Sequence, residues 1–462
     1  MAGWTSPLNL IREELVQLRD EGCRIPAHLL QRIAELHPER DEWNTRALEP
    51  IYQELMRLEP DAALAAREPN DLQGIRALRP KGPRDLKWRP SDSELLDRLH
   101  GAWTGRFCGC ALGKPVEGMG MRRVNGRLDG RRAIKQYLQE RNDWPLKDYF
   151  SAREVDPNLK IWPSGSVREK IQYMEPDDDV HYSLVGLGAL EQFGPEFTWQ
   201  NVGEYWIAHI PISCICTAET QAVTNLMNRS TRGRGGNATP AFTRRYWNPY
   251  REWIGAQIRA DGWAWCCAGK PELAAEFAHR DACWTHERNG IYGEMFMAAI
   301  IAAAFVEKDP ARLVEIGLSE IPAECRLAQY VRQLQGWIRE SPDWEACMDR
   351  IEAALPDMHV VHTINNALIC IMALHYGKMD VVESPAIAVM GALDTDCNGA
   401  TVGSITGAAC GRARYRDDLA GRLNDTVKPA MIGFQQATMK ELAERTAKVW
   451  KRVEEYAASR KP

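Results

Sequence analysis

Glycine recurs at every fourth position in two segments of this chain, and that spacing limits the possible folds more than any other feature of the sequence. The two series are Gly101, Gly105, Gly109 and Gly113, and Gly399, Gly403, Gly407 and Gly411. On a helix, residues four positions apart share one narrow stripe, and glycine there lets a second backbone approach closely. Each glycine lowers helix propensity by about 1 kcal/mol relative to alanine, so four of them need a packing reason. The sequence therefore predicts two helices that cross closely at the centre of the molecule.

Helical periodicity extends over most of the chain, whereas strand-like alternation is nearly absent. Apolar residues recur at three-and-four spacing in the segments 8–19, 27–36, 43–58, 178–192, 199–207, 217–227, 252–260, 271–284, 291–306 and about 436–458. Residues 118–170 are rich in glycine, proline, arginine and tryptophan, and we expect long loops there. The predicted fold class is all-α.

The chain is predicted to divide into two parts. Residues 1–90 are expected to form a helical N-terminal accessory region or cap. The basic, proline-bearing stretch 79–90 at its end is typical of a linker. Ser91 and Glu94 then have the spacing of a capping box, which predicts that the main domain, residues 91–462, opens with the first glycine-striped helix.

Composition argues against several classes of protein. The formal net charge of −5 at pH 7 offers no general basic surface for nucleic acid or a membrane. No apolar run reaches the length of a membrane span, and the first residues lack the pattern of a secretory signal. The thirteen cysteines are scattered without a disulfide-like pattern, as in proteins of a reducing compartment. We therefore expect a cytoplasmic protein that binds neither membranes nor nucleic acid.

Five aspartates at the starts of two predicted helices are the strongest candidates for chemistry. Asp177, Asp178 and Asp179 open one helix, and Asp394 and Asp396 stand just before the second glycine series. Acids are favoured at helix N-termini by backbone N–H groups and the helix dipole, so capping alone is one explanation. Together, however, they match the oxygen ligands that Mg²⁺ and Mn²⁺ prefer. Two such ions, roughly 3.5–4 Å apart, would hold substrate hydroxyls and a water.

Three motifs, in this order, resemble the signature motifs of the ADP-ribosylglycohydrolases, also called ADP-ribosyl-acceptor hydrolases. They are the glycine-rich segment that ends in Leu112-Gly-Lys-Pro-Val-Glu117, the turn Asp177–Asp179, and the run from Asp394 to Gly403. The resemblance covers residues from about 92 to 435. It implies an all-α helical bundle with a binuclear Mg²⁺ or Mn²⁺ site at the bottom of a cleft, here with an N-terminal helical extension.

The resemblance also implies metal ligands from the first acidic motif. In the family this motif is usually Thr/Ser-Asp-Asp-Thr, and its first three residues bind metal. The leucine pattern that follows favours Asp177 at the hydroxyl position, with Asp178 and Asp179 at the two aspartates. The competing register begins at Pro176 and would lose one side-chain ligand.

The second acidic motif of the family is usually Asp-x-Asp-Thr/Ser, which matches Asp394 and Asp396 to the metal-binding aspartates. Cys397 stands where the family has a hydroxyl ligand. A thiol is softer than a hydroxyl, so Cys397 either leaves its place to a water or favours Mn²⁺ or a softer ion.

The family also suggests catalytic residues. Glu117 matches the glutamate that, in some members, faces the ribose and activates or orients the attacking water. As a general base it must lie within hydrogen-bond reach of that water. Glu117 and Asp178 are the predicted catalytic residues.

Candidates for substrate contact come from a block, residues 248–293, that resembles a branch of the family with extra loops. They are Gly255, Asp261, His286, Asn289 and Tyr292, with Trp263 available to stack on a ring. A core or capping role explains each of them equally well, and a lone histidine is usually structural. The basic, glycine-rich stretch 229–240 suits either a phosphate-binding loop or a solvated surface loop.

The leading hypothesis is a metal-dependent hydrolase that removes ADP-ribose from a protein or a small-molecule acceptor by cleaving the glycosidic bond at the anomeric carbon. Its partner would be an ADP-ribose-like small molecule or an ADP-ribosylated protein. Two alternatives stay open: a hydrolase of another N-ribosyl bond in a nucleotide or nucleoside, and a non-catalytic member that binds ADP-ribose. The sequence does not distinguish arginine, serine, a nucleobase or an acetyl ester as the acceptor, and it does not indicate the oligomeric state.

Overall fold

The chain folds almost entirely into helices. The computed structural model describes residues 2–153, 156, 158–230, 238–415 and 419–460. The strands in these ranges form two antiparallel hairpins, β1 (Arg123–Val124) with β2 (Arg127–Leu128), and β3 (Thr426–Val427) with β4 (Ala437–Thr438). The predicted all-α class is confirmed. No helix of the described ranges combines the length and the apolar composition that crossing a membrane requires.

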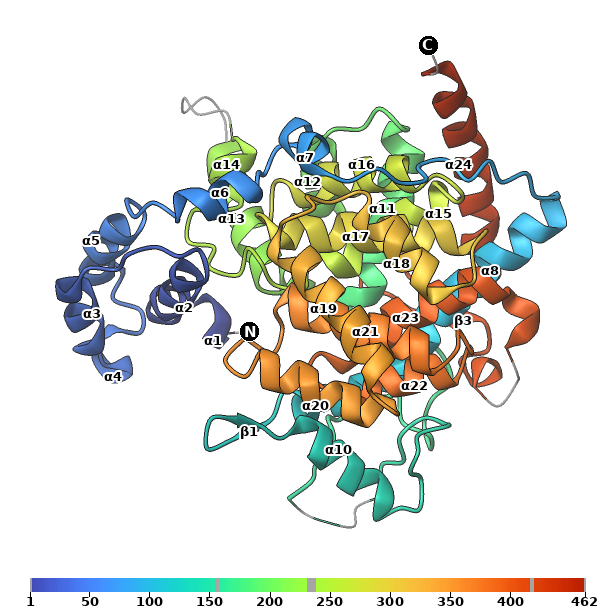
Figure 1. Ribbon diagram of the computed structural model, residues 1–462, viewed down its shortest axis with the longest axis horizontal. Helices are drawn as coiled ribbons and strands as arrows, with labels where there is room; N and C mark the ends of the chain where they lie inside the picture. Colours follow the sequence, from blue (N-terminus) through green and yellow to red (C-terminus); the bar gives the residue numbers. More distant parts are fainter. Residues whose placement is uncertain (1, 154–155, 157, 231–237, 416–418, 461–462) are drawn as a thin grey trace.

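Short helices make up the N-terminal region, drawn in blue in Figure 1. They are α1 (Ala2–Thr5), α2 (Pro7–Asp20), α3 (Ala27–Ala34), α4 (Pro38–Asp41), α5 (Thr45–Leu55), α6 (Ala62–Arg67) and α7 (Leu72–Leu78). Helices α2 to α5 form a lobe at the left of Figure 1 with a small core of its own, which includes Leu18, Leu29 and Leu48. Ile75 of α7 belongs instead to the large core of the main body. The three helices predicted in this region are confirmed, with ends that differ by a few residues.

The stretch predicted as a linker, residues 79–90, has no helix or strand but packs on the main body. Arg79 pairs with Glu320 at 2.5 Å, and the N–H of Leu86 donates to the carbonyl of Gly269 at 2.9 Å. After this stretch, the hydroxyl of Ser91 accepts a hydrogen bond from the N–H of Glu94 at 3.2 Å. The helix predicted to open the main domain therefore begins where its capping signal indicates.

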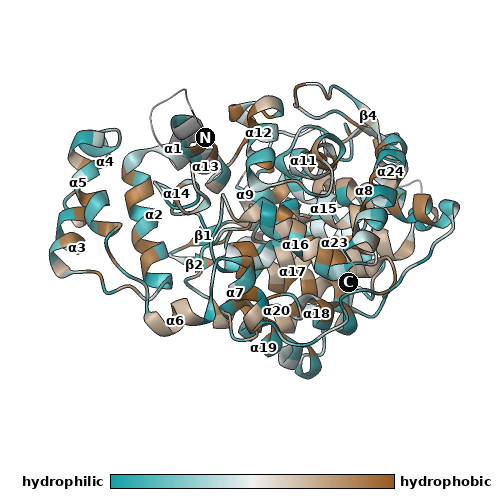
Figure 2. Ribbon diagram, turned by 90° about the horizontal axis from the view of Figure 1, so that it is seen from above, coloured by the Kyte–Doolittle hydropathy of each residue, from teal (hydrophilic) through white to brown (hydrophobic). Residues whose placement is uncertain are grey.

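The main body is a bundle whose central helices are buried on every side. Its α-helices are α8 (Asp92–Gly113), α9 (Glu117–Gly120), α10 (Gly130–Gln139), α11 (Asp178–Phe193), α12 (Trp199–His209), α13 (Ala218–Ser230), α14 (Pro240–Thr243), α15 (Ala260–Cys266), α16 (Pro271–Ala282), α17 (Asn289–Ala304), α18 (Pro310–Leu318), α19 (Arg326–Glu340), α20 (Trp344–Ala354), α21 (Thr363–Tyr376), α22 (Glu383–Met390), α23 (Thr395–Cys410) and α24 (Met439–Ser459). Its 3₁₀ helices are η1 (Lys114–Val116), η2 (Ile212–Cys214), η3 (Gln257–Arg259), η4 (Arg412–Arg414) and η5 (Ala420–Leu423). Every residue of α17 is buried, and Figure 2 shows hydrophobic residues gathered around α17 and α23.

The two glycine series pack against each other, as the spacing predicts, in helices α8 and α23. Gly101 faces Gly407, Gly105 faces Gly403 and Gly109 faces Gly399, so the helices run antiparallel. A Cβ added at Gly399 would lie 2.5 Å from the carbonyl oxygen of Gly109, and the other facing positions leave as little room or less. Because the backbones touch, the C-terminal end of α8 lies beside the N-terminal end of α23.

The second acidic motif follows a strained turn that lies beside the end of α8. Ala392 and Leu393 both adopt positive φ angles, 68° and 59°, which cost side-chain-bearing residues about 1–2 kcal/mol each. Two hydrogen bonds stabilise the turn. The N–H of Leu393 donates to the carbonyl of Gly120 at 3.2 Å, and the hydroxyl of Thr395 donates to the carbonyl of Gly113 at 2.8 Å. Contacts to the end of α8 and to α9 thus fix the position of the acids that follow.

One predicted helix, residues 252–260, is wrong. The chain makes turns up to residue 256 and becomes helical only in η3 and α15. The backbone groups of this stretch bond across the fold: the N–H of Ile254 donates to the carbonyl of Val361 at 2.9 Å, and the N–H of Thr363 donates to that of Glu252 at 3.1 Å. These tertiary bonds replace those of a local helix.

Candidate metal centre

The predicted metal-binding acids meet at the starts of α11 and α23. Asp177 caps α11, and its carboxylate accepts a hydrogen bond from the N–H of Asp179 at 3.0 Å. Asp394 stands at the N-cap of α23, and its N–H donates to the side-chain oxygen of Asn366 at 3.2 Å. The acids at the two helix N-termini therefore face one another, and the dipole of each helix favours negative charge at that end.

Two groups of possible ligand atoms form within this cluster, and in each group all atoms lie within 4.8 Å of one another. The members of one group are Cys110, Asp177, Asp179 and Asp396, and those of the other are Asp394, Asp396 and Cys397. Asp396 belongs to both groups. Asp178 lies outside both groups but lines the adjoining pocket.

Two cationic side chains already pair with part of the cluster. Lys114 lies 2.6 Å from Asp177, and Arg106 lies 2.6 Å from Asp179 and 2.9 Å from Asp261. Arg106 is fully buried and also donates to the carbonyl of Ile258 at 2.7 Å. Arg106 therefore connects the cluster to the buried carboxylate of Asp261.

The remaining acids are influenced mainly by burial and by other carboxylates. Burial raises the pKa of Asp178 well above its ordinary value, and the charges of Asp177 and Asp179 add to the effect. Burial and the charge of Asp396 likewise raise the pKa of Asp394. For Glu117 the charge of Asp396 is the largest cause, followed by burial. The cluster thus holds more negative charge than its own cations balance.

These residues fit Mg²⁺ or Mn²⁺. One carboxylate oxygen of Asp394 and one of Asp396 are buried with no hydrogen-bond partner among the described residues. Such atoms are costly unless a ligand satisfies them. A divalent cation would use these oxygen donors and offset the excess negative charge.

Cys397 lies within the cluster as a thiol. Its Sγ lies 3.1 Å from a carboxylate oxygen of Asp179, to which the S–H donates. Burial raises the pKa of this thiol well above its ordinary value, and Asp179 and Asp394 raise it further. A bound cation that used Cys397 would have to displace this proton.

A pocket of about 210 Å³ opens onto the acids. Side chains from both parts of the chain line it: Trp4, Glu117, Met121, Asp177, Asp178, Cys216, Thr217, Glu219, Trp253, Ile254, Gly255, Ile258, Val361, Asp394, Asp396 and Cys397. The lining combines the acids and Glu117 with apolar and aromatic side chains such as Trp4, Trp253 and Ile254. The pocket therefore suits a ligand with a polar end and a flat or apolar end.

The structure brings only one of the five residues predicted for substrate contact, Gly255, into this pocket. Asp261 lies behind the acids on Arg106. His286 is buried behind the wall, with its Nε2 3.8 Å from Glu219, which does line the pocket. Trp263 is also buried and stacks on Phe197, with ring centroids 4.6 Å apart.

Asn289 and Tyr292 lie elsewhere, against the N-terminal region. The amide of Asn289 donates to Glu252 at 2.8 Å and to Glu68 at 3.0 Å, and the hydroxyl of Tyr292 donates to the carbonyl of Pro69 at 2.5 Å. Their placement corrects the expectation that they face the cleft, because these contacts use their polar atoms in packing. Of the basic stretch 229–240, residues 231–237 lie outside the described residues.

Several site residues were not predicted. Lys114 lies inside the first motif, three residues before Glu117, so its place beside the acids had a sequence signal. Cys110 and Arg106 lie about one and two helical turns before Lys114 on the buried face of α8. Trp4 and Trp253 had no such signal, because their contact depends on how distant segments pack.

Comparison with known proteins places this arrangement in context. A family model described as ADP-ribosylglycohydrolase matches residues 91–456. No curated protein matches the chain. Among solved structures, one titled "ADP-ribosylglycohydrolase-related protein complex" is similar at 17% sequence identity and a TM-score of 0.47, covering 78% of this chain and 99% of that one.

Proposed function

The chain belongs to the ADP-ribosylglycohydrolase family, and from this premise we propose that it is a metal-dependent hydrolase acting on the glycosidic bond at the anomeric carbon of an ADP-ribosyl group. The proposal rests on one observation above all. Buried acids from α11 and α23 converge at one end of a pocket and exceed the cations available to balance them. Such a site favours the binding of a cation.

The proposed ligands are Asp177, Asp178, Asp179, Asp394 and Asp396, with Cys397 at the edge of the set. When bound there, Mg²⁺ or Mn²⁺ would supply Lewis-acid polarisation and fixed positions for sugar hydroxyls. We propose two ions, because the ligand atoms fall into two groups that share Asp396.

The chain's own residues would perform the remaining steps. Glu117 lines the pocket beside the acids, and its carboxylate is proposed to accept a proton from the attacking water. Lys114 helps to keep Asp177 ionised: burial raises the pKa of Asp177, but Lys114 together with hydrogen bonds from Asp179 and Asp178 gives a net downward shift. Ionised carboxylates at the pocket end would stabilise the positive charge that develops on the sugar as the bond breaks.

The size of the pocket favours a second candidate within the same chemistry. About 210 Å³ is less than the roughly 300–1,000 Å³ typical of pockets for drug-sized ligands. A ribosyl group with one attached ring would fill it, whereas an ADP-ribosyl substrate would extend from it past the exposed ring of Trp4. A hydrolase of a smaller N-ribosyl compound, such as a nucleoside, is therefore the second candidate.

Hydrolysis of a substrate panel by the Mn²⁺-loaded protein tests the proposal. The panel comprises ADP-ribosylated arginine and serine peptides, O-acetyl-ADP-ribose and a purine nucleoside, with products separated by chromatography. Release of ADP-ribose is expected, and Glu117→Gln should lower kcat by roughly 10²–10⁴-fold. Glu324→Gln, at an exposed glutamate, serves as the control and should keep full activity.

The results of the panel distinguish the candidate functions. Cleavage of the nucleoside alone would replace the first candidate by the second. Binding of ADP-ribose without turnover of any substrate would contradict both and leave a non-catalytic binding protein.

A further inference from the structure

The pocket has one wall from outside the segment that matches the family model. Trp4 lies in α1, far from residues 91–456, yet it lines the same pocket as the acids. Its side chain is 39% exposed, although tryptophan usually buries most of its large apolar surface. In Figure 1 the N-terminus lies next to the main body rather than on the outer side of the N-terminal lobe.

An aromatic group holds Trp4 in place. Its ring meets Trp253 edge-to-face at a centroid distance of 5.5 Å and Tyr250 at 6.2 Å. Trp253 in turn stacks on His359 at 4.0 Å. The backbone is also fixed, because the hydroxyl of Tyr250 donates to the carbonyl of Trp4 at 2.6 Å and accepts from the amide of Asn9 at 3.0 Å. The face of Trp4 that remains uncovered is therefore presented in a defined orientation.

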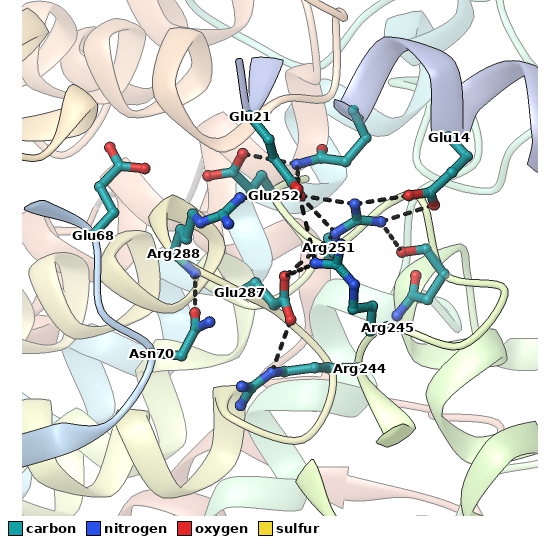
Figure 3. A network of polar contacts seen from close by, with 12 residues as sticks. Glu14, Glu21, Glu68, Asn70, Arg244, Arg245, Arg251, Glu252, Glu287 and Arg288 are labelled. Carbon is teal, nitrogen blue, oxygen red and sulfur yellow. Dashed lines mark hydrogen bonds and ion pairs between the residues drawn. The ribbon is translucent and has the colours of Figure 1, made fainter. Parts of the chain in front are cut away.

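Buried ion pairs attach the rest of the N-terminal region to the main body. We call the residues labelled in Figure 3 the junction network: Glu14, Glu21, Glu68, Asn70, Arg244, Arg245, Arg251, Glu252, Glu287 and Arg288. Arg251, from the main body, lies 2.8 Å from both Glu14 and Glu21 of the N-terminal region, and all three side chains are fully buried. Figure 3 shows these acids pointing towards Arg251.

A second set of contacts extends this attachment. Arg326 of α19 lies 2.8 Å from Glu68 and 2.6 Å from Glu252. The amide of Gln17 in α2 donates to Glu252 at 2.9 Å. The N-terminal region is thus a fixed part of the structure, and Trp4 is a fixed part of the pocket.

We infer that Trp4 is a ligand-binding residue that stacks on a nucleobase of the ligand whose ribosyl group reaches the acids. This inference rests on the proposed function for the polar end of the pocket. Trp4 and Trp253 both line the pocket, and an exposed indole such as that of Trp4 stacks on the π-face of a base. The N-terminal region thereby adds a ligand contact that residues 91–456 do not provide by themselves.

Calorimetric titration of the full-length, Mn²⁺-loaded protein with ADP-ribose tests this role. Trp4→Ala should bind ADP-ribose about tenfold more weakly than the wild type, because base stacking on an aromatic side chain is lost. Trp4→Phe should keep most of the affinity, since it retains a ring. Trp43→Ala removes an indole that is 60% exposed on the same N-terminal region but absent from the pocket lining, and it should bind normally.

A second measurement tests whether Trp4→Ala is still folded normally. Thermal melting of Trp4→Ala should match that of Trp43→Ala to within a few degrees. ADP-ribose should change the tryptophan fluorescence of the wild type more than that of Trp4→Phe, because only the former carries the stacked indole.

Normal binding of ADP-ribose by Trp4→Ala would overturn the role of Trp4 and leave the proposed function intact. Absence of ADP-ribose binding by the wild type would overturn the proposed ligand together with this inference. Equal loss of affinity in Trp4→Ala and Trp43→Ala would also overturn it, since the effect would then not depend on the pocket.

Discussion

Carboxylates are buried at both the metal centre and the junction network, but their neighbours differ. At the junction network the acids face arginines. Burial would raise the pKa of Glu21, but Arg251, Arg288 and Arg245 outweigh it and lower this pKa to about 2. At the metal centre the acids face one another, and burial with like charges raises the pKa of Asp396 to about 6.

This difference distinguishes the acids that hold the fold together from the acids that are proposed to bind a ligand. A buried acid with its own arginine is satisfied within the chain and connects two parts of the fold. A buried acid whose neighbours are mostly other acids lacks such a partner, and we propose that a bound cation satisfies it. The predictions below test whether the two regions respond in opposite ways when a charge is removed.

Breaking the junction network should have the largest effect. Arg251→Ala leaves Glu14 and Glu21 buried without their main partner, so the free energy of unfolding should fall by about 3–5 kcal/mol. Denaturant unfolding measures this loss. Arg312→Ala breaks a half-exposed pair with Glu315 and should change stability by about 1 kcal/mol or less. A similar small change in both variants would contradict the view that the junction network holds the N-terminal region in place.

Acid should weaken the same network through Glu21. Its folded-state pKa of about 2 lies below the ordinary value of 4.5, so its stabilising contribution is complete above about pH 4.5 and is lost as pH falls towards 2. The shift corresponds to about 3 kcal/mol. Wild type and Glu21→Gln should therefore differ in stability at pH 7 and converge near pH 2. A constant difference between them over this range would show that Glu21 is not ionised and paired.

The metal centre should respond with the opposite sign. In metal-free protein, Asp178→Asn should raise the free energy of unfolding by about 1 kcal/mol, because a neutral amide avoids the cost of burying a carboxylate and relieves its repulsion by Asp177 and Asp179. Asp343→Asn is the matched control: its side chain caps α20, where asparagine caps equally well, so stability should stay nearly constant. A loss of stability in Asp178→Asn would mean that this carboxylate is satisfied within the chain.

Local signals predicted much of the fold. The helices α2, α11, α17 and α24 follow from apolar spacing and capping residues, which act within a few residues of the chain. The close crossing of α8 and α23 was also predictable, because the paired glycine series have few other uses. The closeness of Gly113 to Asp396 follows from that crossing, whereas the approach of Asp177 was expected only from the resemblance to the family.

Features that depend on distant packing could not be predicted. The stretch 252–260 has helical spacing, yet its backbone bonds to residues 361–363 and forms turns. Nothing near Trp4 in the sequence indicates that it reaches the pocket, and nothing near Arg251 indicates its partners in α2. Asn289 and Tyr292 stand in a block that resembles the family, but their side chains face the N-terminal region instead of the cleft.

Calorimetric titration of metal-free protein with Mn²⁺ tests the central claim, that the unbalanced acids form a divalent-metal centre. The wild type should bind two ions, Asp396→Ala should lose measurable binding of at least one, and Glu324→Gln should bind as the wild type does. Mn²⁺ at 100 times its Kd should also stabilise the wild type by about 2.7 kcal/mol for each site. Absence of Mn²⁺ binding by the wild type, or unchanged binding by Asp396→Ala, would contradict the claim and return the five aspartates to the role of helix caps.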